Sequence, residues 1–418
     1  MSKVLISFLG TGSQTNGSYR KAEYRITLPT DNATQMVYET SFVADALATH
    51  YGVDKIILIG TVKSMWDEVY YSFCTRNKKE VEDEDEEYYR HLSDTCKKAN
   101  FNSPLELPDI ERLEAALGKD SHVVLVRYGL NEEELNFNIA QVLSVEQYLN
   151  NDDELIVDIT HSFRSLPMLL MNTLIYLKNV SKKKINISHI TYGMLDITRE
   201  LGYTPVIDLK KVMDVNEWIS ASYSFMEFGN AYKIAGLLEA DNSKSQAKVL
   251  RDFSNVKNLN DIQAIENQVQ RLKSVSQLSP IAEITVRPVI NSITQAFSNT
   301  KSHSEFQFRL AYWHYSIHNY SSAYITLVEA IITYVCEQEG LDYSNKDQRD
   351  NAKDTLMKNK DYRELKKIYE PVNRNRKRIA HSIAYSSEAL NGSKMINLLK
   401  ENLEKFKEIL EQTPKTWP

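Results

Sequence analysis

The sequence predicts an α/β domain with a mostly parallel sheet, followed by an all-α region. In the first half, short apolar runs alternate with helical patterns, and each run ends in a polar or glycine turn, which is typical of βαβ units. From about residue 215 onward the pattern is mostly helical. The length of 418 residues suits two or three domains. We place them at residues 1–212, 213–300 and 301–418, the middle segment being a helical connector.

Five apolar runs rich in β-branched residues are the expected strands. They cover residues 4–9, 55–59, 122–127, 155–159 and 187–192. The helical patterns between them cover residues 40–50, 110–117, 132–149 and 167–180. Ligands of such sheets bind beyond the carboxyl ends of the strands, where this sequence places Gly, Thr, His and Arg.

The second half is expected to form a set of amphipathic helices without a fixed repeat. They cover residues 216–239, 261–278, 288–299, 306–318, 321–339 and 387–411. In the first half the acidic run at residues 80–87, EVEDEDEE, interrupts the strand and helix pattern, and we expect a solvated loop or helix face there.

Composition excludes several classes of protein. The formal charge of −6 excludes a uniformly basic nucleic-acid coat but leaves room for a local basic site. No apolar run reaches the roughly 18 residues of a membrane helix, and the N-terminus lacks the pattern of a secretory signal. Cys74, Cys96 and Cys336 are too far apart to suggest disulfides or a zinc cluster, so a cytoplasmic protein without a metal is expected.

The turn after the fourth expected strand, with the sequence DITHSFRSLP, is a candidate anion site. A helix begins near Pro167, so the turn faces free N–H groups at a helix N-terminus. Hydroxyls come from Thr160, Ser162 and Ser165, the Arg164 guanidinium suits a phosphate, and His161 can donate, accept or stack on a base. A capping or packing role is the plainer alternative for the histidine.

Two further strand ends follow the same logic. Gly10, Thr11 and Gly12 allow close approach of a ligand and add a hydroxyl, although the spacing is not that of a dinucleotide or P-loop fingerprint. After the second strand, Thr61 ends the run and Trp66 could stack on a base. The alternatives are a structural turn for Gly-Thr and a core position for the tryptophan.

A second candidate site lies in the segment PVNRNRKRIAHS, which starts at residue 371. Arginine would hold a scissile phosphate and His381 would move a proton, as metal-free RNA cleavage by the 2′-hydroxyl requires. On an unbroken helix Arg374 shares a face with His381, whereas Arg376 is turned by about 140°. Clustered carboxylates that could hold a metal are absent around the segment. A basic helix end with a packing histidine is the alternative.

These residues resemble the CRISPR-associated effector ribonucleases of type III systems, which join a Rossmann-like CARF sensor to a helical HEPN nuclease. VLISFLGTG, IVDITHSFRSLP and ISHITYG look like the CARF part, and the R-x4-6-H pattern near the C-terminus looks like the HEPN part. The pattern fits Arg376 with His381 at four-residue spacing, and Arg374 with Asn375 and His381 at six-residue spacing. The choice of arginine therefore stays open.

The resemblance implies a cytoplasmic homodimer that senses cyclic oligoadenylate, with the tetra-adenylate favoured and the hexa-adenylate possible. Residues Thr11, Thr160, His161, Ser162 and Arg164 fall where the family contacts its ring. Two HEPN domains would form a composite, metal-independent site that cuts single-stranded RNA. A sensor without catalysis, such as a ligand-gated scaffold or transcription factor, is the competing hypothesis. A sensor that also degrades its own ring is a third.

Overall fold

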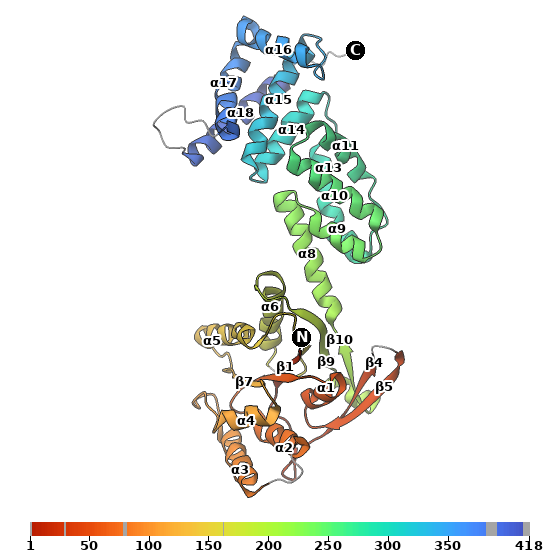
Figure 1. Cartoon of the computed structure of the whole chain (residues 1–418), viewed down its shortest axis with the longest axis vertical. Helices are drawn as coiled ribbons and strands as arrows, with labels where there is room; N and C mark the ends of the chain where they lie inside the picture. Colours follow the sequence, from red (N-terminus) through yellow and green to blue (C-terminus); the bar gives the residue numbers. More distant parts are fainter. Residues whose placement is uncertain (1, 29–30, 78–81, 162, 382–390, 413–418) are drawn as a thin grey trace. The chain divides into compact units, whose positions relative to one another are not determined.

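The computed structural model describes residues 2–28, 31–77, 82–161, 163–381 and 391–412. The chain forms two compact units, Met1–Asp214 and Val215–Pro418, and Figure 1 shows the sheet and its helices in the first and helices throughout the second.

The first unit is built on a sheet of eight strands in the order β5-β4-β10-β9-β8-β1-β6-β7. The strands are β1 Lys3–Leu9, β4 Ala22–Leu28, β5 Asp31–Thr40, β6 Lys55–Gly60, β7 His122–Leu125, β8 Glu154–Asp158, β9 Asn186–Gly193 and β10 Thr204–Asp208. A small hairpin, β2 Gln14–Thr15 and β3 Ser18–Tyr19, follows β1.

Five strands, from β9 through β8, β1 and β6 to β7, run parallel, and they are the five that the sequence predicted. The other three are a difference from the prediction. β10 pairs antiparallel with β9, and β4 and β5 extend the sheet beyond it. β4 was missed because its side chains alternate between buried and part-exposed, so it has no continuous apolar run.

Helices cover both faces of the parallel strands. The helical segments of this unit are α1 Val43–Tyr51, α2 Trp66–Asn77, α3 Asp83–Lys98, α4 Ile110–Leu117, α5 Glu132–Leu143, η1 Ser144–Tyr148, α6 Ser165–Asn179, η2 Leu195–Ile197 and α7 Thr198–Leu201. Alternate residues of β1 enter two different cores: Leu5 and Leu9 pack with α1 to α4, whereas Ile6 and Phe8 pack with α5 and α6. The sheet is thus buried on both sides, which explains the unbroken apolar runs.

The second unit is helical. Its helical segments are α8 Lys210–Phe228, which starts in the first unit, α9 Tyr232–Ala240, α10 Lys244–Leu259, α11 Ile262–Lys273, α12 Pro280–Thr285, α13 Arg287–Ala296, α14 His303–Ser316, α15 Tyr320–Gln338, α16 Lys346–Lys358, η3 Lys360–Tyr362, α17 Arg363–His381 and α18 Gly392–Gln412. One apolar cluster joins α8 to α14 and a second joins α14 to α18. The proposed boundary at residue 300 stays a prediction, since both parts belong to this unit.

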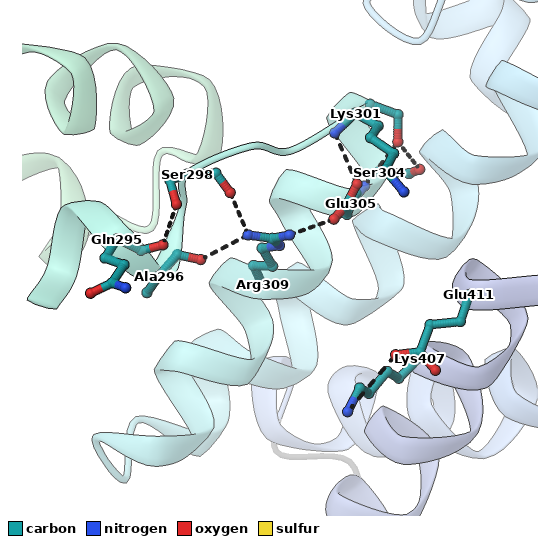
Figure 2. Close-up of polar contacts among 10 residues, drawn as sticks. Gln295, Ala296, Ser298, Lys301, Ser304, Glu305, Arg309, Lys407 and Glu411 are labelled. Atoms are coloured by element: carbon teal, nitrogen blue, oxygen red, sulfur yellow. Dashed lines mark hydrogen bonds and ion pairs between the residues drawn. The ribbon is translucent and has the colours of Figure 1, made fainter. Parts of the chain in front are cut away.

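Helix α14 contributes to both clusters, and its N-terminal turn is fastened to the preceding loop (Figure 2). Arg309 donates to the backbone oxygen of Ser298 at 2.6 Å and to Glu305 at 2.7 Å. Glu305 in turn accepts the backbone N–H of Lys301 at 2.8 Å. These bonds satisfy polar groups at the turn between α13 and α14 and fix where α14 starts.

One helical expectation needs correction. The stretch 216–239 is not one helix, because the chain turns at Gly229, whose φ is +63°. A Cβ there would lie 2.8 Å from the Trp313 ring. Glycine is therefore required both by the backbone conformation and by the space available. For the acidic run, the helix alternative is confirmed: residues 83–87 form the first turns of α3, where carboxylates suit the helix dipole. Residues 387–390 of the last expected helix lie outside the described residues.

Candidate functional site

The first candidate site lies at the carboxyl edge of the parallel strands. β1 sits between β6 and β8, so the chain leaves β1 to one side of the sheet and returns later on the other. Such a switch point leaves a crevice at the strand ends, where ligands bind. Gly10 follows β1 and His161 follows β8, and a Cβ on Gly10 would lie 3.5 Å from the His161 Cβ. The structure therefore brings two of the predicted residues together.

Asp158, the last residue of β8, organises this edge. Its side chain accepts the hydroxyl of Ser7 from β1 at 2.6 Å and that of Thr160 at 2.5 Å. Thr160 in turn accepts the N–H of Gly193, at the end of β9, at 2.7 Å. Burial raises the pKa of Asp158 to about 6, although the bonds from Ser7 and Thr160 oppose the shift. The network ties the ends of three neighbouring strands together.

His161 presents an unused polar atom beside this network. Its Nε2 is buried and has no hydrogen-bond partner among the described residues. Burial lowers its pKa to about 4, so the ring is neutral near pH 7. A buried nitrogen without a partner costs free energy. A ligand that donates to or accepts from Nε2 would recover that cost.

The exposed residues of the site supply hydroxyl, backbone and cationic groups. Thr11, Gly12, Arg164 and Ser165 are exposed, and Arg164 and Ser165 stand at the N-terminus of α6. Gly12 has a φ of +64°, and a Cβ there would lie 2.7 Å from the Tyr19 ring. The predicted site residue Ser162 lies outside the described residues.

Two predicted ligand residues are placed elsewhere by the structure. Trp66 has no exposed surface, and its Nε1 donates to the backbone oxygen of Thr61 at 2.8 Å. Thr61 is buried as well, and its N–H is bound by the Ser64 hydroxyl. Both residues hold the turn after β6 from inside. Base stacking on Trp66 was therefore a wrong expectation, and the core alternative describes its position.

Two residues of the site were not predicted as part of it. Asp158 was read only as part of a strand, and Ser7 as part of an apolar run. The sequence signal that could have revealed this network was the carboxylate of Asp158 inside a buried strand, because a buried charge needs partners. Thr160 is a near neighbour in the chain, but Ser7 lies on an adjacent strand and more than a hundred residues away in sequence, so the sequence alone could not name it.

The second candidate site lies on α17. The helix is continuous through His381, so Arg374 and His381 share a face, as predicted for an unbroken helix. Both side chains are exposed, whereas Asn375 and Arg376 are half-buried. The structure thus meets the condition under which Arg374 is the arginine aligned with His381.

Asn375 and Arg376 are held by neighbours instead. The Asn375 side chain donates to the hydroxyl of Tyr324 on α15 at 3.1 Å. Arg376 donates to Asn373 at 3.1 Å, and Asn373 donates to Tyr369 at 3.2 Å. The Asn375 bond ties α17 to α15, whereas the bonds of Arg376 and Asn373 lie within α17. Arg374 and His381 stay open to solvent.

Within the part of the chain that the structure describes, no group of three or more His, Cys, Asp or Glu is arranged to hold a metal ion. None of the described helices is long and apolar enough to cross a membrane. All three cysteines are buried and unpaired.

Comparison with known proteins agrees with the sheet unit and extends beyond it. Residues 4–196 match the family model of the CARF domain of the CRISPR system endoribonuclease Csx1. Residues 214–304 match the model of the second domain of the CRISPR-associated protein MJ1674. The chain is 30% identical over 442 aligned positions to the CRISPR-associated protein MJ1674 of Methanocaldococcus jannaschii, and the alignment covers 98% of this chain and 68% of that protein.

Proposed function

Because the chain belongs to the CRISPR-associated CARF effectors related to MJ1674 and Csx1, we propose that it is a ribonuclease switched on by cyclic oligoadenylate. The observation that carries the sensing half is the network of Asp158, Thr160 and Gly193 beside the unpartnered His161 Nε2. The cutting half rests on the shared face of Arg374 and His381.

The strand-end site has the groups that a cyclic oligoadenylate needs. Arg164 offers a guanidinium to a phosphate, and the α6 N-terminus adds free backbone N–H groups. Gly10 and Gly12 let backbone approach the ring without a Cβ in between. His161 Nε2 is the buried atom that a base or ribose hydroxyl can pair with. Cyclic tetra-adenylate is the favoured ring and the hexa-adenylate the alternative.

At the α17 site, the proposed reaction is transfer within the RNA backbone. The 2′-oxygen bonds to phosphorus while the bond to the 5′-oxygen breaks, which leaves a 2′,3′-cyclic phosphate and a 5′-hydroxyl. One imidazole takes the 2′-hydroxyl proton or delivers a proton to the 5′-oxygen, the role proposed for His381. Arg374 neutralises charge that grows on the phosphate, with Arg376 as the alternative.

A second copy of the chain is part of the proposal. A ring with two-fold symmetry is bound best by a two-fold site, and an isologous dimer supplies one. The same symmetry would pair two α17 helices, each contributing an arginine and a histidine. Binding can activate cleavage only if the ring prefers one of two arrangements of the dimer.

The sensing half is tested by calorimetry with cyclic tetra- and hexa-adenylate on the full chain. Arg164→Ala should weaken ring binding by about tenfold or more, since it removes a charge-assisted contact. Lys182→Ala removes an exposed cation near the start of β9, at the opposite edge of the sheet, and should bind as the unaltered protein does. Equal loss in both variants, or in neither, would remove Arg164 from the site.

The cutting half is tested separately with fluorescent RNA. His381→Ala should abolish ring-stimulated cleavage while ring affinity is kept. His91→Ala changes an exposed histidine on α3 and should cut normally. Ring binding without cleavage by the unaltered protein would favour the non-catalytic sensor.

Degradation of the ring by the sensor is a second candidate, favoured by the neutral His161 whose Nε2 has no partner. Incubating ring with His381→Ala protein should then yield linear products, and the additional change His161→Ala should stop it. An intact ring after incubation with His381→Ala protein would dismiss this activity.

A further inference from the structure

A cavity lies between α2 and α3, among residues that the proposed sensing site does not use. Its volume is about 300 Å³. The lining includes the rings of Tyr70, Tyr71 and Tyr89, the carboxylates of Asp85 and Glu86, and the guanidinium of Arg90. The two helices lie side by side in the first unit, with α4 nearby (Figure 1).

The rings give the cavity an aromatic wall that solvent can reach. Tyr71 is 51% exposed, and its ring centroid lies 5.7 Å from that of Tyr89 with the planes tilted by 56°. Both rings line the same cavity and are set at an angle to each other. Such a space attracts a cation through the negative faces of the rings.

Acidic residues outnumber basic ones around the cavity, where Arg90 is the one cation in the lining. The acidic run forms the start of α3, and Asp67 and Glu68 occupy the first turn of α2. Burial is the main cause that raises the pKa of the Tyr89 phenol, and the negative charges of Asp67 and Glu68 raise it further. This surrounding field repels phosphate and attracts cations.

A guanidinium already lies beside Tyr70 and Asp85, two of the residues that line the cavity. Arg112 from α4 pairs with Asp85 at 3.0 Å, donates to the Tyr70 hydroxyl at 3.2 Å and lies 5.2 Å from the centre of the Tyr88 ring. A carboxylate, a phenol hydroxyl and an aromatic ring thus surround one cation among α2, α3 and α4. The cavity lining contains the same kinds of group, carboxylates and tyrosine rings.

Arg90 occupies part of the cavity as an internal cation. It pairs with Glu86 one turn earlier on α3 at 3.0 Å, and 75% of its side chain is exposed. An exposed pair of this kind contributes little stability, so a ligand can displace it. Glu86 is then the carboxylate left to meet the incoming charge.

We infer that the cavity between α2 and α3 binds an organic cation, an ammonium or guanidinium group held between the rings of Tyr71 and Tyr89 and the carboxylate of Glu86. The site is distinct from the proposed ring site and does not depend on the proposed function. A nucleobase could also stack on the tyrosines, but the acidic surroundings disfavour nucleotides, and that outcome is built into the test.

The experiment is saturation-transfer NMR titration of the full chain with four probes. Choline and N-acetylarginine methylamide carry the two cations, 3,3-dimethylbutan-1-ol is the neutral isostere of choline, and adenosine is the stacking probe. A cation should bind and the neutral isostere should not. Stronger choline binding would indicate a small-molecule ammonium as ligand, and stronger binding of the arginine probe would indicate a side chain of a partner protein.

Variants locate the binding. Tyr71→Leu and Glu86→Gln should each weaken cation binding by about three- to tenfold. Arg90→Gln should strengthen it by a similar factor, because it removes the internal competitor. Glu87→Gln is the matched control for Glu86, since Glu87 is exposed on the same helix and does not line the cavity. Lys98→Gln is the control for Arg90, since it breaks the comparable pair with Asp94.

Three results would overturn the inference. One is that neither cation binds, and another is that adenosine or the neutral isostere binds as well as choline. The third is that Arg90→Gln changes cation affinity no more than Lys98→Gln does, because the cation would then bind elsewhere. Unchanged thermal unfolding of Tyr71→Leu confirms that any loss of binding is local.

Discussion

The hydroxyl of Thr160 donates a hydrogen bond of 2.5 Å to the carboxylate of Asp158, two residues earlier at the end of β8. The same hydroxyl accepts the N–H of Gly193, so the orientation of Thr160 is set from both sides. A fully buried carboxylate therefore positions the loop that carries His161 and Arg164. Asp158 is a positioning residue for the proposed ring site.

Asp158 and His161 should give the protein opposite pH dependences of stability. The Asp158 pKa rises from 3.8 to about 6 on folding, so the folded state holds its proton more tightly. Its contribution to the free energy of unfolding therefore falls as pH rises between about 4 and 6. The His161 pKa falls from 6.5 to about 4, so its contribution rises over about pH 4 to 6.5.

Single variants should separate these two contributions in denaturant unfolding from pH 4 to 7. In Asp158→Asn, the free energy of unfolding should increase more steeply with pH than in the unaltered protein. The difference should reach up to about 3 kcal/mol across this pH range. His161→Asn should change the slope in the other direction by a comparable amount. The same slope in all three proteins would contradict the burial of both groups.

Gly12, in the loop after β1, should not tolerate a side chain. Gly12→Ala places a Cβ 2.7 Å from the Tyr19 ring and adds strain at a φ of +64°. We expect a loss of about 1–3 kcal/mol in the free energy of unfolding, together with weaker ring binding. Gly17→Ala is the matched control, because its φ is +85° but no atom lies within 4 Å. Equal losses would show that Tyr19 does not restrict the loop.

Much of this site follows from sequence, and some of it does not. The apolar run of β8 and its polar turn predicted where His161 and Arg164 lie, because a buried strand followed by a helix leaves few alternatives. The bond from Ser7 to Asp158 is long-range and was missed. The prediction for Trp66 was wrong because the sequence pattern near a strand end is the same whether an aromatic residue faces a ligand or the core. β10 was missed because it contains Pro205, which argues against a strand inside a sheet.

The two arginines of α17 should differ in their effects. Arg374→Ala should reduce cleavage by about 100-fold or more with little change in stability, since the side chain is exposed and shares a face with His381. Arg376→Ala should act mainly by loosening Asn373, with a smaller loss of cleavage. Initial rates on RNA, with Lys377→Ala as the control, would decide. A larger loss in Arg376→Ala would reverse the assignment.

Tyr324 should be a structural support of the α17 site. Its hydroxyl donates to the Met395 backbone oxygen on α18 at 2.7 Å and accepts Asn375 from α17 at 3.1 Å. Tyr324→Phe leaves both partners without that bond and should cost about 1–3 kcal/mol of unfolding free energy. Tyr362→Phe removes a more exposed bond to Glu339 and should cost less than about 0.5 kcal/mol. Similar unfolding curves for the two variants would contradict this role.

The most direct test of the proposed function is cleavage of a fluorescent single-stranded RNA in EDTA, with and without cyclic tetra- or hexa-adenylate. The account predicts cleavage only when a ring is present, with 2′,3′-cyclic phosphate and 5′-hydroxyl ends and no requirement for added metal. Cleavage that is independent of either ring, or ring binding without any cleavage, would contradict it.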